Sequence, residues 1–214
     1  MSNRYIFAGL CALGLAYAGG ASAVIVGGEV TSYSGNATGT FINLTVPFSE
    51  SNPNNTVGNN TFNTANLYAF NEDQNIVLAD TLNVDIGRDM LAGEMIASHY
   101  VFFDPLKLNR QKGYVDFDAD IIGVATSRGT LSASDFLANN DVTYRNPTLR
   151  GLENDDHVTV AGSRIYVNWR ANTPGDYIRV FTERSPVAAV PLPATLPLLA
   201  FVIGGLGFVA RRKA

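Results

Sequence analysis

The sequence predicts an all-β fold, an antiparallel β-sandwich that is jelly-roll-like or Ig-like. Short apolar runs recur through the middle of the chain, and several of them alternate apolar with polar side chains, as half-buried strands do. Gly, Asn and Pro gather between these runs, where they favour turns. Helix signals are few. Many short strands separated by such turns are typical of two sheets packed face to face.

The two ends of the chain differ from its middle, so we expect three regions. Residues 1–23 are predicted to be a signal peptide, and residues 24–186 are predicted to form the β-sandwich. Residues 187–214 are predicted to hold a stalk, a sorting signal and a single C-terminal membrane helix.

The first region has the three parts of a secretory signal peptide. Arg4 gives the positive start, and Ile6–Ala18 is an apolar run without charge. Its 13 residues are fewer than the roughly 20 that a membrane-spanning helix needs. Ala21 and Ala23 form a small-residue cleavage site, so we expect the mature chain to start at Val24. A buried N-terminal helix is the alternative. The partners that this end implies are the export machinery and signal peptidase.

The middle region contains ten predicted strands. They are Val24–Val30, Thr40–Val46, Leu67–Phe70, Asn75–Ala79, Ile96–Phe103, Gly113–Phe117, Ile121–Thr126, His157–Val160, Arg164–Trp169 and Tyr177–Glu183. One short capped helical turn is predicted over Ser132–Ala138, and the stretch Asp85–Met95 is ambiguous. The Asn-rich segment Ser51–Asn66 is interpreted as a long polar loop between strands.

Alternation is clearest in the last part of this region. Ile165, Val167 and Trp169 share one side of a predicted strand, while the residues between them are polar or amphipathic. Gly162 marks a hairpin before this strand, and residues 172–176 form a turn that contains Pro and Gly. We therefore expect the last three strands to form an antiparallel meander.

The C-terminal region ends in an apolar run followed by a basic cluster. From Pro197 to Ala210 the run has 14 residues, about 21 Å as a helix, which is short for a bilayer core of about 30 Å. Tilt and snorkelling of the basic side chains make a single span feasible. Cytoplasmic flanks carry an excess of Lys and Arg, so these residues are predicted to stay inside. The basic anchor consists of Arg211, Arg212 and Lys213.

A proline-containing motif precedes this run, and it consists of Val190, Pro191, Leu192, Pro193 and Ala194. Motif, short apolar helix and basic end together resemble the PEP-CTERM sorting tail of Gram-negative bacteria in its VPLPA-CTERM variant. The resemblance covers Val190–Ala214 and departs from the commoner Pro-Glu-Pro spelling. It implies that an exosortase, a membrane protease-transpeptidase, cuts near the motif. It also implies a link to exopolysaccharide and biofilm systems.

The charge of the middle region limits its partners. All 19 acidic residues and 11 of the 15 basic residues lie between Val24 and Ala189, which gives this segment a net charge of −8. Nucleic-acid binding needs a basic surface, so no nucleic acid is expected as a partner. Cys11 is the only cysteine and lies in the predicted signal peptide, which leaves the mature chain without a thiol.

One acidic motif is a candidate metal site. Asp116, Asp118 and Asp120 alternate along the chain, and oxygen ligands at alternate positions can bind Ca²⁺ in a loop. The motif is not an EF-hand, because Ile121 stands where Gly is required. The alternative is a strand with one polar face whose apolar residues point inward. Ca²⁺ is the one cofactor considered, and no other is predicted.

A second acidic cluster lies beside a histidine. Glu153, Asp155 and Asp156 precede His157, and a carboxylate next to a histidine can orient a general base. An acidic turn before a strand is the alternative. His99 lies in an apolar strand and is interpreted as a packed core residue.

Polysaccharide is a further candidate partner. Exposed tyrosines can form a platform for sugar rings, although most aromatic residues of a sandwich lie in its core. The candidates are Tyr33, Tyr68, Tyr114 and Tyr144. A polysaccharide hydrolase would need two carboxylates, and the sequence singles out no such pair.

The two termini and the acidic middle region together predict a non-enzymatic bacterial protein of the cell surface or extracellular matrix. It is expected to be exported, held at the inner membrane as an anchored intermediate, and then placed on the cell surface or released. A carbohydrate- or Ca²⁺-binding module is the alternative, and a polysaccharide-active hydrolase is a third hypothesis.

Overall fold

The structure, a computed structural model, describes residues 23–35 and 37–184. Helix in these residues is limited to α1 (Arg128–Ala133) and two short 3-10 turns, η1 (Asp135–Leu137) and η2 (Pro147–Leu149). The rest of the regular structure is β-strand, which confirms the all-β prediction. None of the helices found in these residues is long and apolar enough to span a membrane. Most of the signal peptide and all of the predicted tail lie outside the described residues.

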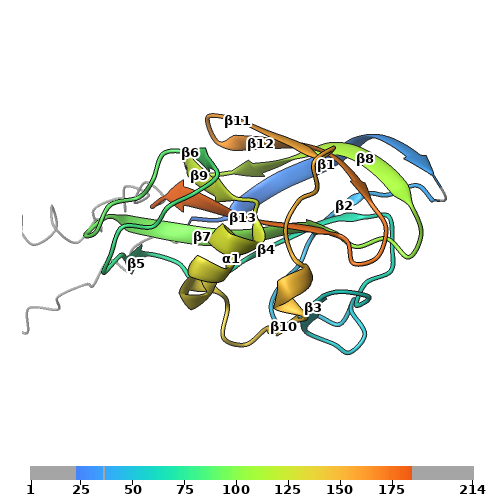
Figure 1. The fold of residues 1–214 in the computed structure, drawn as a ribbon, viewed down its shortest axis with the longest axis horizontal. Coiled ribbons are helices and arrows are strands. Elements are labelled where there is room, and N and C mark those ends of the chain that lie inside the picture. The colour runs from blue at the N-terminus through green and yellow to red at the C-terminus, as the bar shows by residue number, and fades with distance from the viewer. Residues whose placement is uncertain (1–22, 36, 185–214) are drawn as a thin grey trace, which may run out of the picture. The chain divides into compact units, whose positions relative to one another are not determined.

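Two sheets pack against each other, as predicted for a sandwich (Figure 1). The first has the strand order β1-β8-β12-β11 with every pair antiparallel. Its strands are β1 (Ile25–Gly35), β8 (Asn109–Phe117), β11 (His157–Ala161) and β12 (Arg164–Ala171). The second has the order β2-β4-β7-β13-β9-β6, with β5 paired to β7. Its strands are β2 (Phe41–Asn43), β4 (Leu67–Asn71), β5 (Ile76–Val77), β6 (Ile86–Gly87), β7 (Met95–Phe103), β9 (Ile121–Ala125) and β13 (Asp176–Glu183). One of its pairs, β2 with β4, is parallel.

The core between the sheets follows the predicted alternation. Ile165, Val167 and Trp169 of β12 are buried, whereas Tyr166 between them is exposed. They pack against Ile178 of β13 and its neighbours on the inner face of the second sheet. Burying a large apolar side chain contributes roughly 1.5–3 kcal/mol. This alternating face is therefore a major source of the sandwich's stability.

A second core covers the other face of the seven-stranded sheet. Tyr177 and Phe181 of β13 point to this side, opposite to Ile178 and Val180. Helix α1 and a two-stranded parallel ribbon of β3 (Thr56–Gly58) with β10 (Thr143–Arg145) lie here, below the sheet in Figure 1. The sequence does not predict this third layer, because a strand buried on both faces loses its alternation.

The segment Ser51–Asn66 contributes to this layer, so its interpretation as a plain polar loop is wrong. It contains β3, and both Val57 and Phe62 are buried in the second core. Three of its asparagines, Asn55, Asn60 and Asn63, take positive φ. Asparagine tolerates this conformation better than most residues, which explains why a folded segment is rich in it.

The predicted meander of the last three strands is half right. β11 and β12 form an antiparallel hairpin whose turn contains Gly162 at φ 59°, as expected. β13 does not pair with β12, however. It lies between β7 and β9 in the other sheet. The turn at residues 172–176 thus connects one sheet to the other. An apolar strand can pack in either sheet, and local sequence does not show which long-range pairing it makes.

Candidate binding cleft

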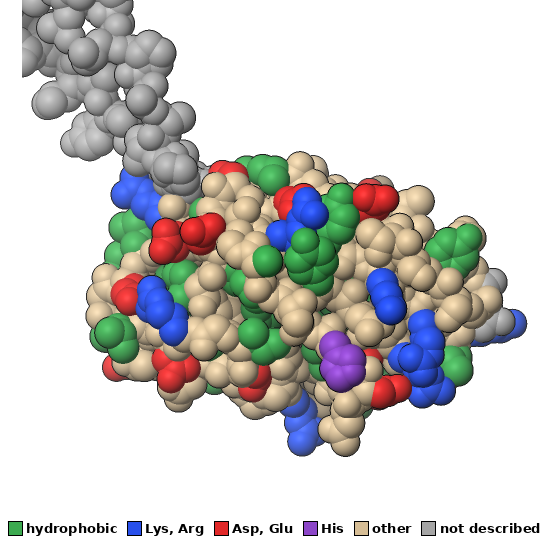
Figure 2. All heavy atoms as spheres, turned by 90° about the horizontal axis from the view of Figure 1, so that it is seen from above, with side chains coloured by type: hydrophobic (Ala, Val, Ile, Leu, Met, Phe, Trp, Pro, Cys, Tyr) green, Lys and Arg blue, Asp and Glu red, His purple; other side chains and the backbone are tan. Residues whose placement is uncertain are grey.

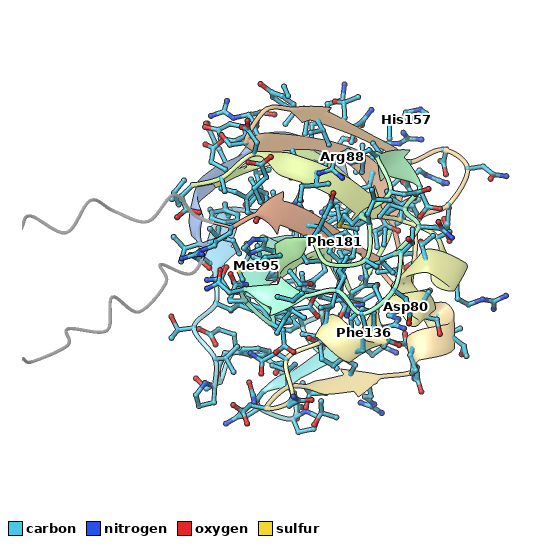
Figure 3. All side chains as sticks on the ribbon, turned by 90° about the vertical axis from the view of Figure 1, so that its left-hand side faces the viewer. Asp80, Arg88, Met95, Phe136, His157 and Phe181 are labelled. Carbon is cyan, nitrogen blue, oxygen red and sulfur yellow. The ribbon has the colours of Figure 1, made fainter. Side chains whose placement is uncertain are left out.

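A cleft of about 550 Å³ opens between the loop after β5 and the helical segment that begins at α1. Figure 3 labels one residue from each wall, Asp80 and Phe136, and shows them next to each other. The side chains that give the cleft its chemistry are those of Asp80, Thr81 and Asn83 on the loop, and those of Thr130 and Phe136 on the helical wall.

An isolated antiparallel β-bridge between Leu82 and Met90 fixes the loop wall of the cleft. The amide of Leu82 donates to the carbonyl of Met90 over 2.8 Å, and the amide of Met90 donates back over 3.0 Å. Both side chains are buried in the second core, which fixes the loop to the sheet. The polar residues on either side of Leu82 consequently stay at the surface, where they line the cleft.

The helical wall is capped by its own serine and by a carboxylate from the loop. The hydroxyl of Ser127 accepts a hydrogen bond from the amide of Thr130, as expected of an N-cap residue. Asp85 accepts from the amides of Thr126 and Ser127 over 2.6 and 2.8 Å, and from the Thr130 hydroxyl. Partial burial alone would raise the pKa of Asp85, but these hydrogen bonds outweigh it and lower the pKa. The ionised Asp85 thereby joins the two walls.

A buried ion pair lies under the helical wall. Arg179 on β13 is fully buried, and its Nε and Nη2 donate to the carboxylate of Glu72 over 2.5 and 2.9 Å. Its Nη1 donates to the carbonyl of Leu131 and to the hydroxyl of Ser134 at the end of α1. Burial would lower the pKa of Arg179, but the charge of Glu72 outweighs it and raises the pKa. The C-terminal end of α1 is therefore held in place by the buried guanidinium of Arg179.

Phe136 gives the cleft an aromatic surface. It is 58% exposed, whereas Leu137 beside it is fully buried and anchors η1 in the core. An exposed ring of this kind can stack on the C–H face of a sugar, and the hydroxyl, amide and carboxylate groups opposite it can bond to sugar hydroxyls. The cleft thus combines an apolar contact with a few polar groups, as ligand sites do.

Comparison with known proteins gives no assignment: no family model, no curated protein and no solved structure matches the chain.

The predicted Ca²⁺ motif does not gather its three carboxylates. Asp116 projects from β8 into a two-bond ion pair with Arg164, at 2.5 and 2.8 Å. Asp118 lies in the turn after β8 and accepts from the amide of Val24 over 2.8 Å, and Asp120 lies in the same turn. Among the described residues, the one set of three acidic side chains with ligand atoms within 4.8 Å of one another lies elsewhere. The alternative interpretation, a strand with apolar residues facing inward, agrees with the burial of Val115.

Two of the four candidate tyrosines face solvent and two do not. Tyr68 is buried, and Tyr144 packs on the second core with its hydroxyl bonded to Glu72. Tyr33 is exposed on β1, and Tyr114 stacks with the guanidinium of Arg164 at 3.8 Å on the outer face of the four-stranded sheet. Figure 2 looks onto this face, where acidic and basic side chains are mixed with small hydrophobic patches. The four tyrosines therefore form no common platform.

The two histidines have different environments. His99 is fully buried between Asn71 and Thr182, with ring nitrogens 2.8 and 3.1 Å from their side-chain oxygens. Burial lowers the pKa of His99 to about 3, so it is neutral, and its prediction as a packed core residue is confirmed. His157 is exposed at the start of β11, where Figure 3 labels it.

The remaining predicted residues are those of export and sorting. Ala23 is described and is buried against Ala97 and Ala119. Ala21, the motif and the basic anchor lie outside the described residues. Sequence reasoning missed the cleft, because its walls are far apart in the chain. One sequence feature does point to the cleft. In a helical turn that buries Leu137, the neighbouring Phe136 faces solvent, which is unusual for a large apolar side chain.

Proposed function

We propose that this chain is an exported, non-enzymatic bacterial protein of the cell surface or extracellular matrix, which binds polysaccharide in the cleft. Export machinery and signal peptidase would act on its N-terminal end. An exosortase-like enzyme would process the tail from an intermediate anchored in the inner membrane. The support for this part is the sequence of the two ends, from Ala21–Ala23 to the motif and basic anchor. We also propose that the sandwich is jelly-roll-like or Ig-like.

The exposed ring of Phe136 across from Asp80 and Asn83 carries the binding proposal. An apolar surface combined with a few polar groups in a hollow is the usual composition of a ligand site. The walls are fixed from below, by the Leu82 bridge on one side and Arg179 on the other, so the site is formed before the ligand arrives. Preorganisation of this kind reduces the entropy lost on binding.

Hydrolysis is the second candidate, and the cleft supports it less well. Glycoside hydrolases use two carboxylates roughly 5–10 Å apart. In the described structure, Asp80 is the one carboxylate residue that lines the cleft. The lining therefore favours binding as its role.

Replacing Phe136 by alanine tests the binding proposal. We expect the Phe136→Ala chain to lose at least tenfold in affinity for extracellular polysaccharide from the producing cells, because the stacking surface is removed. The free energy of unfolding should change by less than about 0.5 kcal/mol, since the side chain is exposed. Migration of the full chain in native gels that contain the polysaccharide measures the affinity, and urea unfolding measures the stability.

Leu149→Ala is the matched control. Leu149 is 46% exposed in η2 and does not line the cleft, so its loss removes a comparable apolar surface elsewhere. This variant should migrate like the unaltered chain. Equal retardation of the Phe136→Ala and unaltered chains would overturn the assignment of the cleft.

A further inference from the structure

A second pocket, of about 250 Å³, lies at the turn between β12 and β13. This turn lies in the right half of Figure 1. Its lining includes Glu153, Arg170 and Asp176. The elements around it belong to both sheets, because β12 is in the four-stranded sheet and β13 is in the seven-stranded sheet. None of its lining residues is shared with the cleft beside α1.

Three carboxylates converge beside this pocket, and one of them, Glu153, also lines it. Glu153, Asp155 and Asp156 each place an oxygen within 4.8 Å of the others. Asp156 fixes their loop, since its two oxygens accept from the amides of Glu153 and Arg170 over 2.8 and 2.7 Å. The guanidinium of Arg170 lies 3.6 Å from Asp155, and both side chains are largely exposed, so this ion pair is weak. Among the described residues this is the one ion pair that the cluster makes, so most of its negative charge is uncompensated.

The buried side chain of Asp176 gives independent support for a ligand at this pocket. It is 1% exposed, and its Oδ2 has no hydrogen-bond partner among the described residues. Buried polar atoms almost always have a partner, and an unpaired one suggests an ion or another ligand. The side chain lies on the same face of β13 as Ile178 and Val180, which pack against the four-stranded sheet. It therefore points between the sheets, toward the pocket that it lines together with Glu153.

Electrostatic coupling links Asp176 to the three carboxylates. Burial first, and then the charges of Asp156, Glu153 and Asp155, raise the pKa of Asp176 to about 9. A further buried carboxylate, that of Asp104 directly after β7, faces the turn, because its Oδ1 lies 3.1 Å from the position that a Cβ on Gly175 would take. That oxygen also has no hydrogen-bond partner among the described residues. Glu153 and Asp176 thus line the pocket, and Asp104 lies against Gly175 in its wall.

We propose that this pocket binds Ca²⁺, with Asp176, Glu153, Asp155 and Asp156 supplying carboxylate oxygens. Ca²⁺ takes six to eight oxygen ligands in flexible geometry, and loops with several carboxylates meet this requirement. A bound cation would neutralise the clustered charge and give Asp176 Oδ2 the partner that it lacks. It would also join the loop before β11 to the turn that connects the two sheets.

Titration of the purified full chain with CaCl₂ tests this inference. We expect a calorimetric Kd of about 0.1–1 mM, the range of extracellular modules, and a higher melting temperature with Ca²⁺. MgCl₂ should bind more weakly, because Mg²⁺ demands stricter geometry. Asp176→Asn keeps the size of the side chain and removes one ligand charge, so it should weaken Ca²⁺ binding at least tenfold.

Two controls make the assignment specific. Asp120→Asn removes an acidic group from the turn after β8, outside the pocket, and should leave Ca²⁺ binding unchanged. Phe136→Ala should also bind Ca²⁺ normally, so failure here is separable from failure of the cleft. The inference is overturned if about 10 mM Ca²⁺, well above the range expected for such modules, produces neither heat nor a shift in melting temperature. It is equally overturned if Asp176→Asn and the unaltered chain bind Ca²⁺ alike.

Discussion

Replacing Arg179 by methionine is expected to lower the free energy of unfolding by about 3–5 kcal/mol, because it leaves a buried charge without its partner. Arg179 is fully buried, and the carboxylate of Glu72 that it binds is equally inaccessible. Glu72 keeps bonds from the hydroxyls of Ser98 and Tyr144, but neither group carries a charge. The midpoint of urea unfolding, with its slope, measures the loss.

An exposed ion pair of the same residue types provides the control. Arg88 binds Glu94 at 2.9 Å, but its side chain is 56% exposed. Arg88→Met should cost less than about 1 kcal/mol, as surface pairs do. Similar losses in the free energy of unfolding for the two methionine variants would show that burial does not make the Arg179 pair more stabilising than a surface pair. A Glu72→Gln/Arg179→Met double variant should lose less than the sum of the single variants, because the two groups are coupled.

Replacing Trp169 by alanine is the second large effect, again about 3–5 kcal/mol. Trp169 is 1% exposed in the core between the sheets, and its ring stacks on Phe103 of the opposite sheet with centroids 6.2 Å apart. Its indole N–H donates to Gln111 over 3.3 Å, so the substitution also removes a partner from a buried amide. Circular dichroism during urea unfolding measures the change. Tryptophan fluorescence cannot be used, because Trp169 is the one tryptophan of the chain.

Tyr166 on the same strand is the matched position on the outer face. It is 42% exposed and contacts Arg164 and Tyr114 at the surface. Tyr166→Ala should cost no more than about 1 kcal/mol, the range of a cross-strand contact. A loss equal to that of Trp169→Ala would contradict the assignment of inner and outer faces.

Local sequence signals predicted the strands well. Each of the ten predicted segments overlaps an observed strand, because period-two patterns and turn residues act over a few positions. The hairpin at Gly162 and the inner face of Trp169 follow from the same signals. His99 was also interpreted correctly, since an apolar strand around a histidine predicts a buried ring.

Long-range pairing could not be predicted in the same way. Nothing near residues 172–176 indicates that the chain changes sheets there. Arg179 alternates with Ile178 and Val180 as an exposed residue would, yet a third layer buries it against Glu72. A charged residue that alternates with apolar ones in a strand is normally expected to face solvent. Arg179 can be buried because Glu72, far away in the sequence, compensates its charge.

Closeness in sequence predicts some clusters of acidic side chains and not others. The aspartates at 116, 118 and 120 are neighbours in sequence, but β8 ends at Phe117, between them, and the three do not gather. Glu153, Asp155 and Asp156 lie in one loop, and their carboxylates do converge. Asp176, which lines the neighbouring pocket together with Glu153, comes from a different strand, and nothing around it in the sequence indicates this position.

We propose that the chain is exported and then processed at both ends. The intact masses of the cell-associated and the released protein test it most directly. We predict a released form that starts at Val24 and ends near the motif Val190–Ala194, and a cell-associated form that still carries the tail. Neutral replacements of Arg211, Arg212 and Lys213 should reduce the released form. Released and cell-associated proteins that both extend from Met1 to Ala214 would contradict the account.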